Sequence, residues 1–175
     1  MPEYPVPDRI KSLGVRQADY NKWLRGRSIA HRKRDGKRVT KTGHAVPALE
    51  VYMGAIHTAV ERCEGVCEYT GESLHWHLIG TWNNDEARTG GAPYKRKFAG
   101  MPTVDHVHGA DGRPISLGDL KVTSWSLNDA KGDMALDQFL TLCHRVVATM
   151  GCAGKSEDTS GRAGEISTNT FSEMG

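Results

Sequence analysis

The sequence contains few cysteines and no long apolar run. No stretch approaches the roughly 20 consecutive apolar residues that span a bilayer, so we expect no membrane partner. The first residues, Met1 to Pro5, lack the charged and then apolar layout of a secretory signal, which favours a cytoplasmic location. The four cysteines are too few for a disulfide scaffold, and in a reducing compartment they are expected to be thiols or metal ligands.

Charge is unevenly distributed along the chain. Residues 1–44 carry 12 Lys and Arg against 4 Asp and Glu, whereas the remaining 131 residues carry 11 against 17. A cationic end on a slightly acidic body predicts a nucleic acid as partner, with a solvated tail as the alternative. Gly36 within the basic run favours a loop or an arm over a continuous helix. The expected phosphate-binding side chains here are Arg32, Lys33, Arg34, Lys37 and Arg38.

Two segments have apolar residues at helical spacing. The first runs from Leu49 to Cys63, and Gly65 suits its end, so we predict a core-packing helix without chemistry. The second runs from Leu136 to Met150, after Asp133 as a candidate N-cap.

The residues between these segments are harder to assign. Residues 74–79 alternate roughly as a strand does, and residues 83–97 are polar and rich in glycine, which predicts a long loop. That loop ends in three further candidate phosphate ligands, Lys95, Arg96 and Lys97.

The predicted organisation has three parts. Residues 1–45 form a basic helical arm that binds DNA, and residues 46–152 form the folded domain. Residues 153–175 are rich in Ser, Thr, Gly and Glu, so we expect a disordered tail.

The side chains that suggest chemistry lie in the second half of the folded domain. Residues 102–107 read as a short strand, which carries Asp105 and His106 near its end. A glycine-rich loop follows, and residues 119–127 alternate well enough for a second strand. Asn128 then stands at the junction with a helix. Strand, loop, strand and helix over about thirty residues make a ββα unit.

This pattern resembles the HNH nuclease family, whose ββα-metal motif is also called the His-Me finger. The matching segments are Asp105-His106-Val107, Asp119-Leu120, and Asn128 followed by Lys131-Gly132-Asp133. The Asp, His, Asn form is similar to that of phage junction-resolving endonucleases. The resemblance implies an α+β fold in which the ββα-metal motif packs on flanking helices beside the basic helical N-terminal region. It does not cover the first 45 residues.

The resemblance also implies roles for single residues. Asp105 and Asn128 would hold Mg²⁺ or Mn²⁺, which prefer oxygen ligands, and Asp119 would fix the loop. His106 would act as general base, since a histidine with its ordinary pKa near 6.5 accepts a proton from water at neutral pH. Adjacent strand residues face opposite sides, so a strand end or a bulge is expected where Asp105 and His106 converge.

Simpler roles remain open for the same residues. Asp105 and His106 could form an ion pair at a strand end, and Asn128 could be an N-cap. Lys131 could bind phosphate or be solvated, and His108 could be an extra ligand or an exposed loop residue. The four tryptophans, Trp23, Trp76, Trp82 and Trp125, could stack on bases, although core burial is expected for most of them.

A structural zinc is not expected. Many HNH proteins hold the hairpin with zinc through two Cys-x-x-Cys pairs, and the second pair would fall at Ser124 and Leu127, which cannot bind zinc.

The predicted function is a DNA endonuclease that hydrolyses phosphodiester bonds with one divalent cation, and the resemblance implies products with 5′-phosphate and 3′-hydroxyl ends. A homodimer is expected if both strands are cut. The alternative is a catalytically inactive HNH-like module that binds nucleic acid.

Overall fold

The computed structural model describes residues 4–39, 45–108 and 116–153. It is a mixed fold with a small sheet, as the expected α+β class requires. The elements in chain order are α1 (Asp8–Lys11), α2 (Gln17–Val39), α3 (Leu49–Cys63), a 3₁₀ turn (Trp76–Leu78), α4 (Asn84–Lys97), β1 (Pro102–His106), a second 3₁₀ turn (Leu117–Asp119), β2 (Leu120–Ser124), α5 (Trp125–Lys131) and α6 (Leu136–Ala153).

The chain divides into two compact units, residues 1–139 and residues 140–175. The expected boundary at residue 45 therefore does not separate two compact parts, because α2 packs against α3 within the first unit. The glycine-rich segment 109–115 and the tail 154–175 lie outside the described residues. No helix of the described part is long and apolar enough to cross a bilayer.

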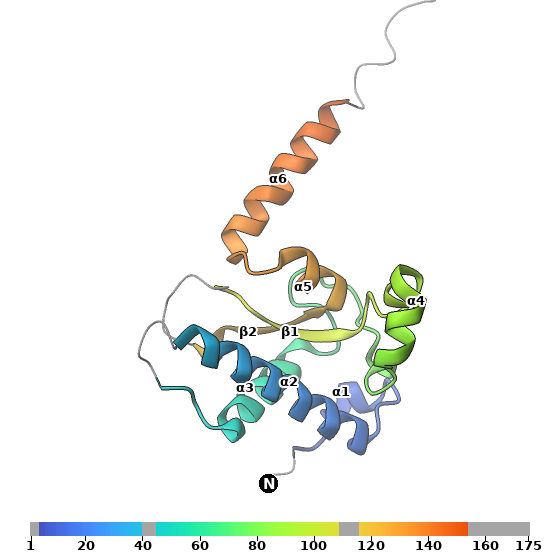
Figure 1. Cartoon of the computed structure of the whole chain (residues 1–175), viewed down its shortest axis with the longest axis vertical. Helices are drawn as coiled ribbons and strands as arrows, with labels where there is room; N and C mark the ends of the chain where they lie inside the picture. Colours follow the sequence, from blue (N-terminus) through green and yellow to red (C-terminus); the bar gives the residue numbers. More distant parts are fainter. Residues whose placement is uncertain (1–3, 40–44, 109–115, 154–175) are drawn as a thin grey trace, which may run out of the picture. The chain divides into compact units, whose positions relative to one another are not determined.

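The sheet is a two-stranded antiparallel pair in which Val104 lies opposite Val122. Both valines are fully buried in the main core with side chains of α2 and α3. Helix α5 packs against both strands as well (Figure 1). The order of β1, β2 and α5 thus agrees with the predicted order of two strands followed by a helix.

Helix α2 covers the free edge of β1. The indole of Trp23 donates to the carbonyl of Pro102 at 3.2 Å, and Nε2 of His31 lies 3.1 Å from the carbonyl of Val104. Unpaired strand edges attract other chains, and a covering helix removes that hazard. Two side chains eight positions apart on α2 therefore take the place of a third strand.

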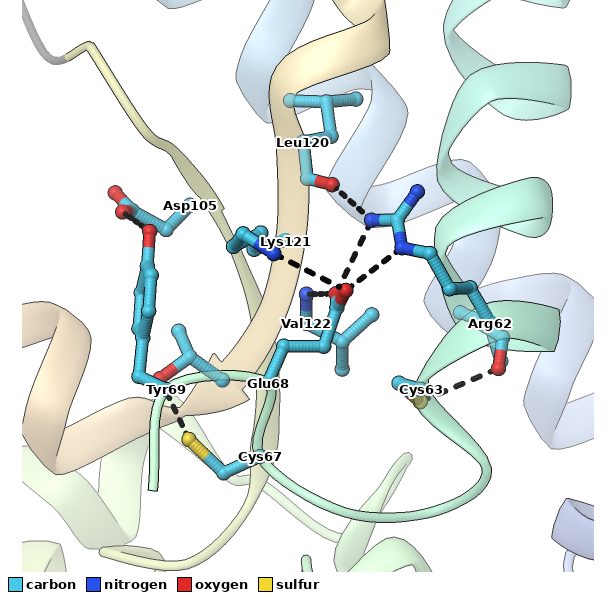
Figure 2. A network of polar contacts seen from close by, with 11 residues as sticks. Arg62, Cys63, Cys67, Glu68, Tyr69, Asp105, Leu120, Lys121 and Val122 are labelled. Carbon is cyan, nitrogen blue, oxygen red and sulfur yellow. Dashed lines mark hydrogen bonds and ion pairs between the residues drawn. The ribbon is translucent and has the colours of Figure 1, made fainter. Parts of the chain in front are cut away.

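The outer edge of β2 is covered by the side chains of Arg62 and Glu68 (Figure 2). The backbone of Glu68 donates to the carbonyl of Val122, and the Val122 amide donates to the Glu68 carboxylate at 2.6 Å. Arg62 binds the same carboxylate at 2.7 Å and donates to the carbonyl of Leu120. A charged pair thus satisfies the backbone groups that a neighbouring strand would otherwise bind.

The basic run is not a loop, because α2 continues through it to Val39. A glycine such as Gly36 costs a helix about 1 kcal/mol relative to alanine. The flanking Lys and Arg are good helix formers, and the buried side chains of His31 and Asp35 anchor this part of the helix. The expected arm is therefore integrated into the core on one face.

The predicted long loop at residues 83–97 is also wrong. Asn83 caps a helix there, accepting from the amides of Asp85 and Glu86, and Gly91 interrupts that helix with a φ of 52°. Tyr94 is buried after the kink and holds the second half in place. The prediction failed because this helix has no apolar face in the sequence. It depends on its N-cap and on one buried aromatic side chain.

Two further elements show how the apolar patterns behave. The expected strand at residues 74–79 is a 3₁₀ turn around Trp76, which is fully buried and donates to the Gly65 carbonyl. The helix predicted to end near Gly65 is confirmed as α3, which ends at Cys63. The second predicted helix is confirmed as α6, although Val147 and Met150 are both 69% exposed.

Candidate active site

His106 is buried against α2, not open to solvent. Its Nε2 lies 3.2 Å from Oδ2 of Asp35, within ion-pair distance but outside hydrogen-bond geometry. The ring of His31 packs edge-on against it, with centroids 5.0 Å apart. The imidazole therefore has polar neighbours, and both of them come from α2.

Asp35 is fully buried and is itself held by two other groups. Tyr52 on α3 donates to Oδ2 at 2.8 Å, and Arg38 lies 3.5 Å from Oδ1. Burial raises the pKa of the Asp35 carboxyl, but His106, Tyr52 and Arg38 outweigh burial and hold it below its usual value. Asp35 is therefore a carboxylate that can fix the orientation of His106.

His31 is a neutral histidine. A carbonyl only accepts, so Nε2, which faces the carbonyl of Val104, carries the ring proton. Burial, with help from the neighbouring His106, lowers the pKa of His31 to about 3. Its Nδ1 is buried and has no hydrogen-bond partner within the described residues.

This buried histidine makes stability depend on pH. Because the folded pKa is about 3 and the unfolded value is about 6.5, the unfolded chain binds the extra proton between these pH values. The free energy of unfolding should therefore fall on acidification, by about 2 kcal/mol between pH 7 and pH 5. Urea unfolding at both pH values tests this. His31→Gln, which keeps a donor for Val104 and does not titrate, should show a smaller loss; an equal loss would contradict the assignment.

Asp105 lies in a separate polar cluster. Tyr69 donates to its Oδ2 at 2.7 Å (Figure 2), and the ammonium of Lys131 lies 3.0 Å from the same oxygen. Lys131 also donates to the carbonyl of His106 at 3.2 Å and is 1% exposed. Burial and the hydrogen bond to Asp105 raise the pKa of Tyr69, so its hydroxyl stays protonated and donates.

Asn128 is inside α5 and not at its start. Ser124 caps this helix, accepting from the amide of Leu127, so the alternative role of Asn128 as an N-cap is excluded. Asn128 lies three residues before Lys131, which puts the two on one face of the helix. Asn128 is half-buried, one turn from the side chain that contacts Asp105.

The side chains of the two predicted catalytic neighbours have different partners, although Lys131 contacts both the Asp105 carboxylate and the His106 carbonyl. Of the two expected alternatives, a strand end or a bulge, the described strand shows the first, because β1 pairs regularly and ends at His106, which lies opposite Leu120. The partners of Asp105 come from α5 and from Tyr69, whereas those of His106 come from α2. Alternation along a regular strand explains this division.

The remaining predicted residues lie around these clusters. The Asp119 carbonyl accepts from the Val107 amide at 3.3 Å, and its carboxylate lies 3.5 Å from Nε2 of His108. Among the predicted phosphate ligands, the exposed ones are Arg32, Lys33, Lys37, Lys95, Arg96 and Lys97, and the half-buried ones are Arg34 and Arg38. Lys131 is buried, so it is neither solvated nor open to a phosphate.

Two of the thiols, those of Cys63 and Cys67, have hydrogen-bond partners within the fold. Cys63 donates to the Val60 carbonyl, and burial raises its pKa to about 11. Cys67 lies 3.3 Å from the hydroxyl of Thr123. Within residues 4–39, 45–108 and 116–153, no three His, Cys, Asp or Glu side chains lie close enough together to hold a metal ion.

Sequence reasoning missed Asp35, His31, Tyr52 and Tyr69. A signal was present on α2, where Trp23, Arg27, His31 and Asp35 recur every four residues in an otherwise charged run. Comparisons with protein-family models, with curated proteins and with solved structures found no match for this chain.

Proposed function

We propose that this chain is a divalent-metal-dependent DNA endonuclease that hydrolyses phosphodiester bonds. The observation that carries the proposal is the order β1, β2, α5, with the buried carboxylate of Asp105 beneath the helix that bears Asn128 and Lys131. The next residue on β1 is His106, which lies beside the Asp35 carboxylate. A ββα-metal motif requires these residue types in this order.

The donor atoms fit a hard cation. The Asp105 carboxylate and the Asn128 amide offer oxygen, which Mg²⁺ and Mn²⁺ prefer, and the carboxylate is buried, where it requires a positive partner. When bound, such a cation would neutralise charge on the phosphate and on the departing 3′ oxygen. Lys131 already supplies one positive charge at Asp105, so it would share or yield that position.

His106 would act as the general base. Asp35 faces Nε2 and holds the ring, so Nδ1 is the nitrogen left to accept a proton from water. Asp35 is thus a positioning residue, contributed by a helix outside the ββα unit.

The exposed cations would bind the DNA backbone. Arg32, Lys33 and Lys37 on α2 and the run 95–97 at the end of α4 are open to solvent. Phosphate contacts fix the register of a duplex without reading its sequence, and they weaken as salt rises. The structural alternative for 95–97 is a favourable interaction of cations with the helix C-terminus.

A cleavage panel tests this proposal. Linear, nicked and branched DNA should be cut in Mg²⁺ or Mn²⁺ and remain intact in EDTA, and Asp105→Asn should abolish the response to metal. Cleavage of both strands would call for a second copy of the chain, which sedimentation can detect. Intact DNA in every metal would refute the endonuclease.

One observation favours a second candidate, the catalytically inactive DNA-binding module. Lys131 already neutralises Asp105, and His106 is buried against α2 beside Asp35, so both predicted catalytic side chains are engaged within the fold. DNA binding that resists EDTA, with no cleavage in any metal, is the result expected for this module.

A further inference from the structure

A groove of about 440 Å³ lies near the N-terminal end of β1, away from His106. It is formed by α2, by the segment that leads into α4 and by the first residue of α5. Its lining includes the side chains of Trp23, Arg27, Trp82 and Trp125. Its volume is in the range of sites that take small molecules or single groups of a larger ligand.

Two tryptophans form one wall of the groove. The rings of Trp82 and Trp125 have centroids 5.9 Å apart, and both residues are half-buried. Trp82 is held in place by the ring of Phe98 at 4.9 Å, the ring of Tyr94 at 5.3 Å and a hydrogen bond from its indole to Asn84. This wall is a preformed aromatic surface that loses little freedom when a flat ring stacks on it.

A cation without a counter-ion lies beside this wall. Arg27 donates to the hydroxyl of Thr103 at 3.3 Å, and no carboxylate of the described residues pairs with it. The Arg27 side chain is half-buried and lines the groove, and burial, followed by the charge of Arg34, lowers its pKa. A partly desolvated charge gains from an anion, and an arginine fork matches the oxygens of a phosphate.

We propose that this groove binds one unstacked nucleotide of a DNA strand, with the base on Trp82 and Trp125 and the phosphate on Arg27. The bases of a regular duplex are stacked on one another, so an aromatic wall selects strands with unpaired or displaced bases. The proposal rests on the proposed function, for which it names the substrate class. The groove and His106 lie at opposite ends of β1, which is about 17 Å long. They would therefore contact different nucleotides of one DNA strand.

The test uses the full chain in EDTA, so that the DNA stays intact. A thymidine 12-mer, a blunt duplex of equal length and thymidine monophosphate are titrated at one salt concentration while tryptophan fluorescence is recorded. Because Trp23, Trp82 and Trp125 all line the groove and Trp76 is fully buried, quenching reports on the groove. We expect quenching by the single strand, with about 10-fold tighter binding than to the duplex.

Matched variants separate the groove from general electrostatics. Arg27→Met and Arg25→Met remove the same charge from α2, but Arg25 is exposed and does not line the groove. Arg27→Met should weaken single-strand binding about 10-fold, and Arg25→Met at most 3-fold. Trp125→Leu should remove most of the quenching, with thermal melts confirming that each variant folds.

The outcomes are distinct from those of the cleavage panel. Equal losses in the two arginine variants, or duplex binding as tight as single-strand binding, would overturn the groove. Quenching by the monophosphate at the same affinity as the 12-mer would show a free-nucleotide site and also overturn it. Groove binding without cleavage refutes the endonuclease and leaves this inference standing.

Discussion

Replacing His106 with alanine is expected to lower kcat for DNA cleavage about 10²- to 10⁴-fold and to leave KM almost unchanged. A positioned general base contributes about this factor, and it acts on water and not on the bound phosphate. Asp35 lies 3.2 Å from the imidazole and orients it. Replacing His106 therefore removes a base that is already positioned before DNA binds. Single-turnover cleavage of a labelled substrate at saturating enzyme measures kcat separately from binding.

Two variants control this prediction. His77→Ala removes an exposed imidazole and should leave cleavage unchanged. Asp35→Asn removes the carboxylate but keeps the size of the side chain, so kcat should fall between those of the wild type and His106→Ala. A decrease in KM alone for His106→Ala, or full activity in that variant, would remove His106 from the mechanism.

Replacing Lys131 with methionine is expected to destabilise the fold by about 3–5 kcal/mol. Removing one partner of a buried ion pair leaves an uncompensated charge, and that is the usual cost. Lys131 is 1% exposed and Asp105 is 3% exposed, so solvent cannot replace the lost ammonium. Tyr69 would remain as the hydrogen-bond donor to the carboxylate. The free energy of unfolding in urea at pH 7.5 is the measurement.

A double variant shows whether the charge is the cause. Asp105→Asn combined with Lys131→Met removes both charges and should recover most of the lost stability. In Lys131→Met alone, millimolar Mg²⁺ should raise the melting temperature if Asp105 and Asn128 hold a cation together. If the double variant is as unstable as the single one, packing by the lysine stem, not charge, explains the loss.

The sequence predicted the elements in which burial follows a simple period. Helix α3 has one apolar face, and β1 and β2 lie near the predicted strands, so the order of elements in the ββα unit was foreseen. Helix α2 has no comparable apolar face, because its buried positions include Ser28, His31 and Asp35. Polar residues buried by pairing give no hydrophobic period, and their partners on β1 are about 70 residues away in the chain.

The candidate site divides in the same way. Asp105, His106 and Asn128 were found from a local motif, since residue types and short spacings are visible in the sequence. The partners that determine their chemistry, Tyr69 and Asp35, belong to other segments and are brought in by packing. The regular pairing of β1 up to His106 could not be foreseen, because a bulge depends on the partner strand.

The covering of β1 by α2 has a consequence for any shortened form of this protein. A fragment that begins after residue 45 would lack the donors for Pro102 and Val104 and the acid beside His106. Such a fragment would expose the unpaired edge of β1 and the apolar side chains that α2 covers, so it should self-associate. The thirty residues that resemble a nuclease motif are therefore not expected to fold on their own. Grafting them onto another protein would require α2 as well.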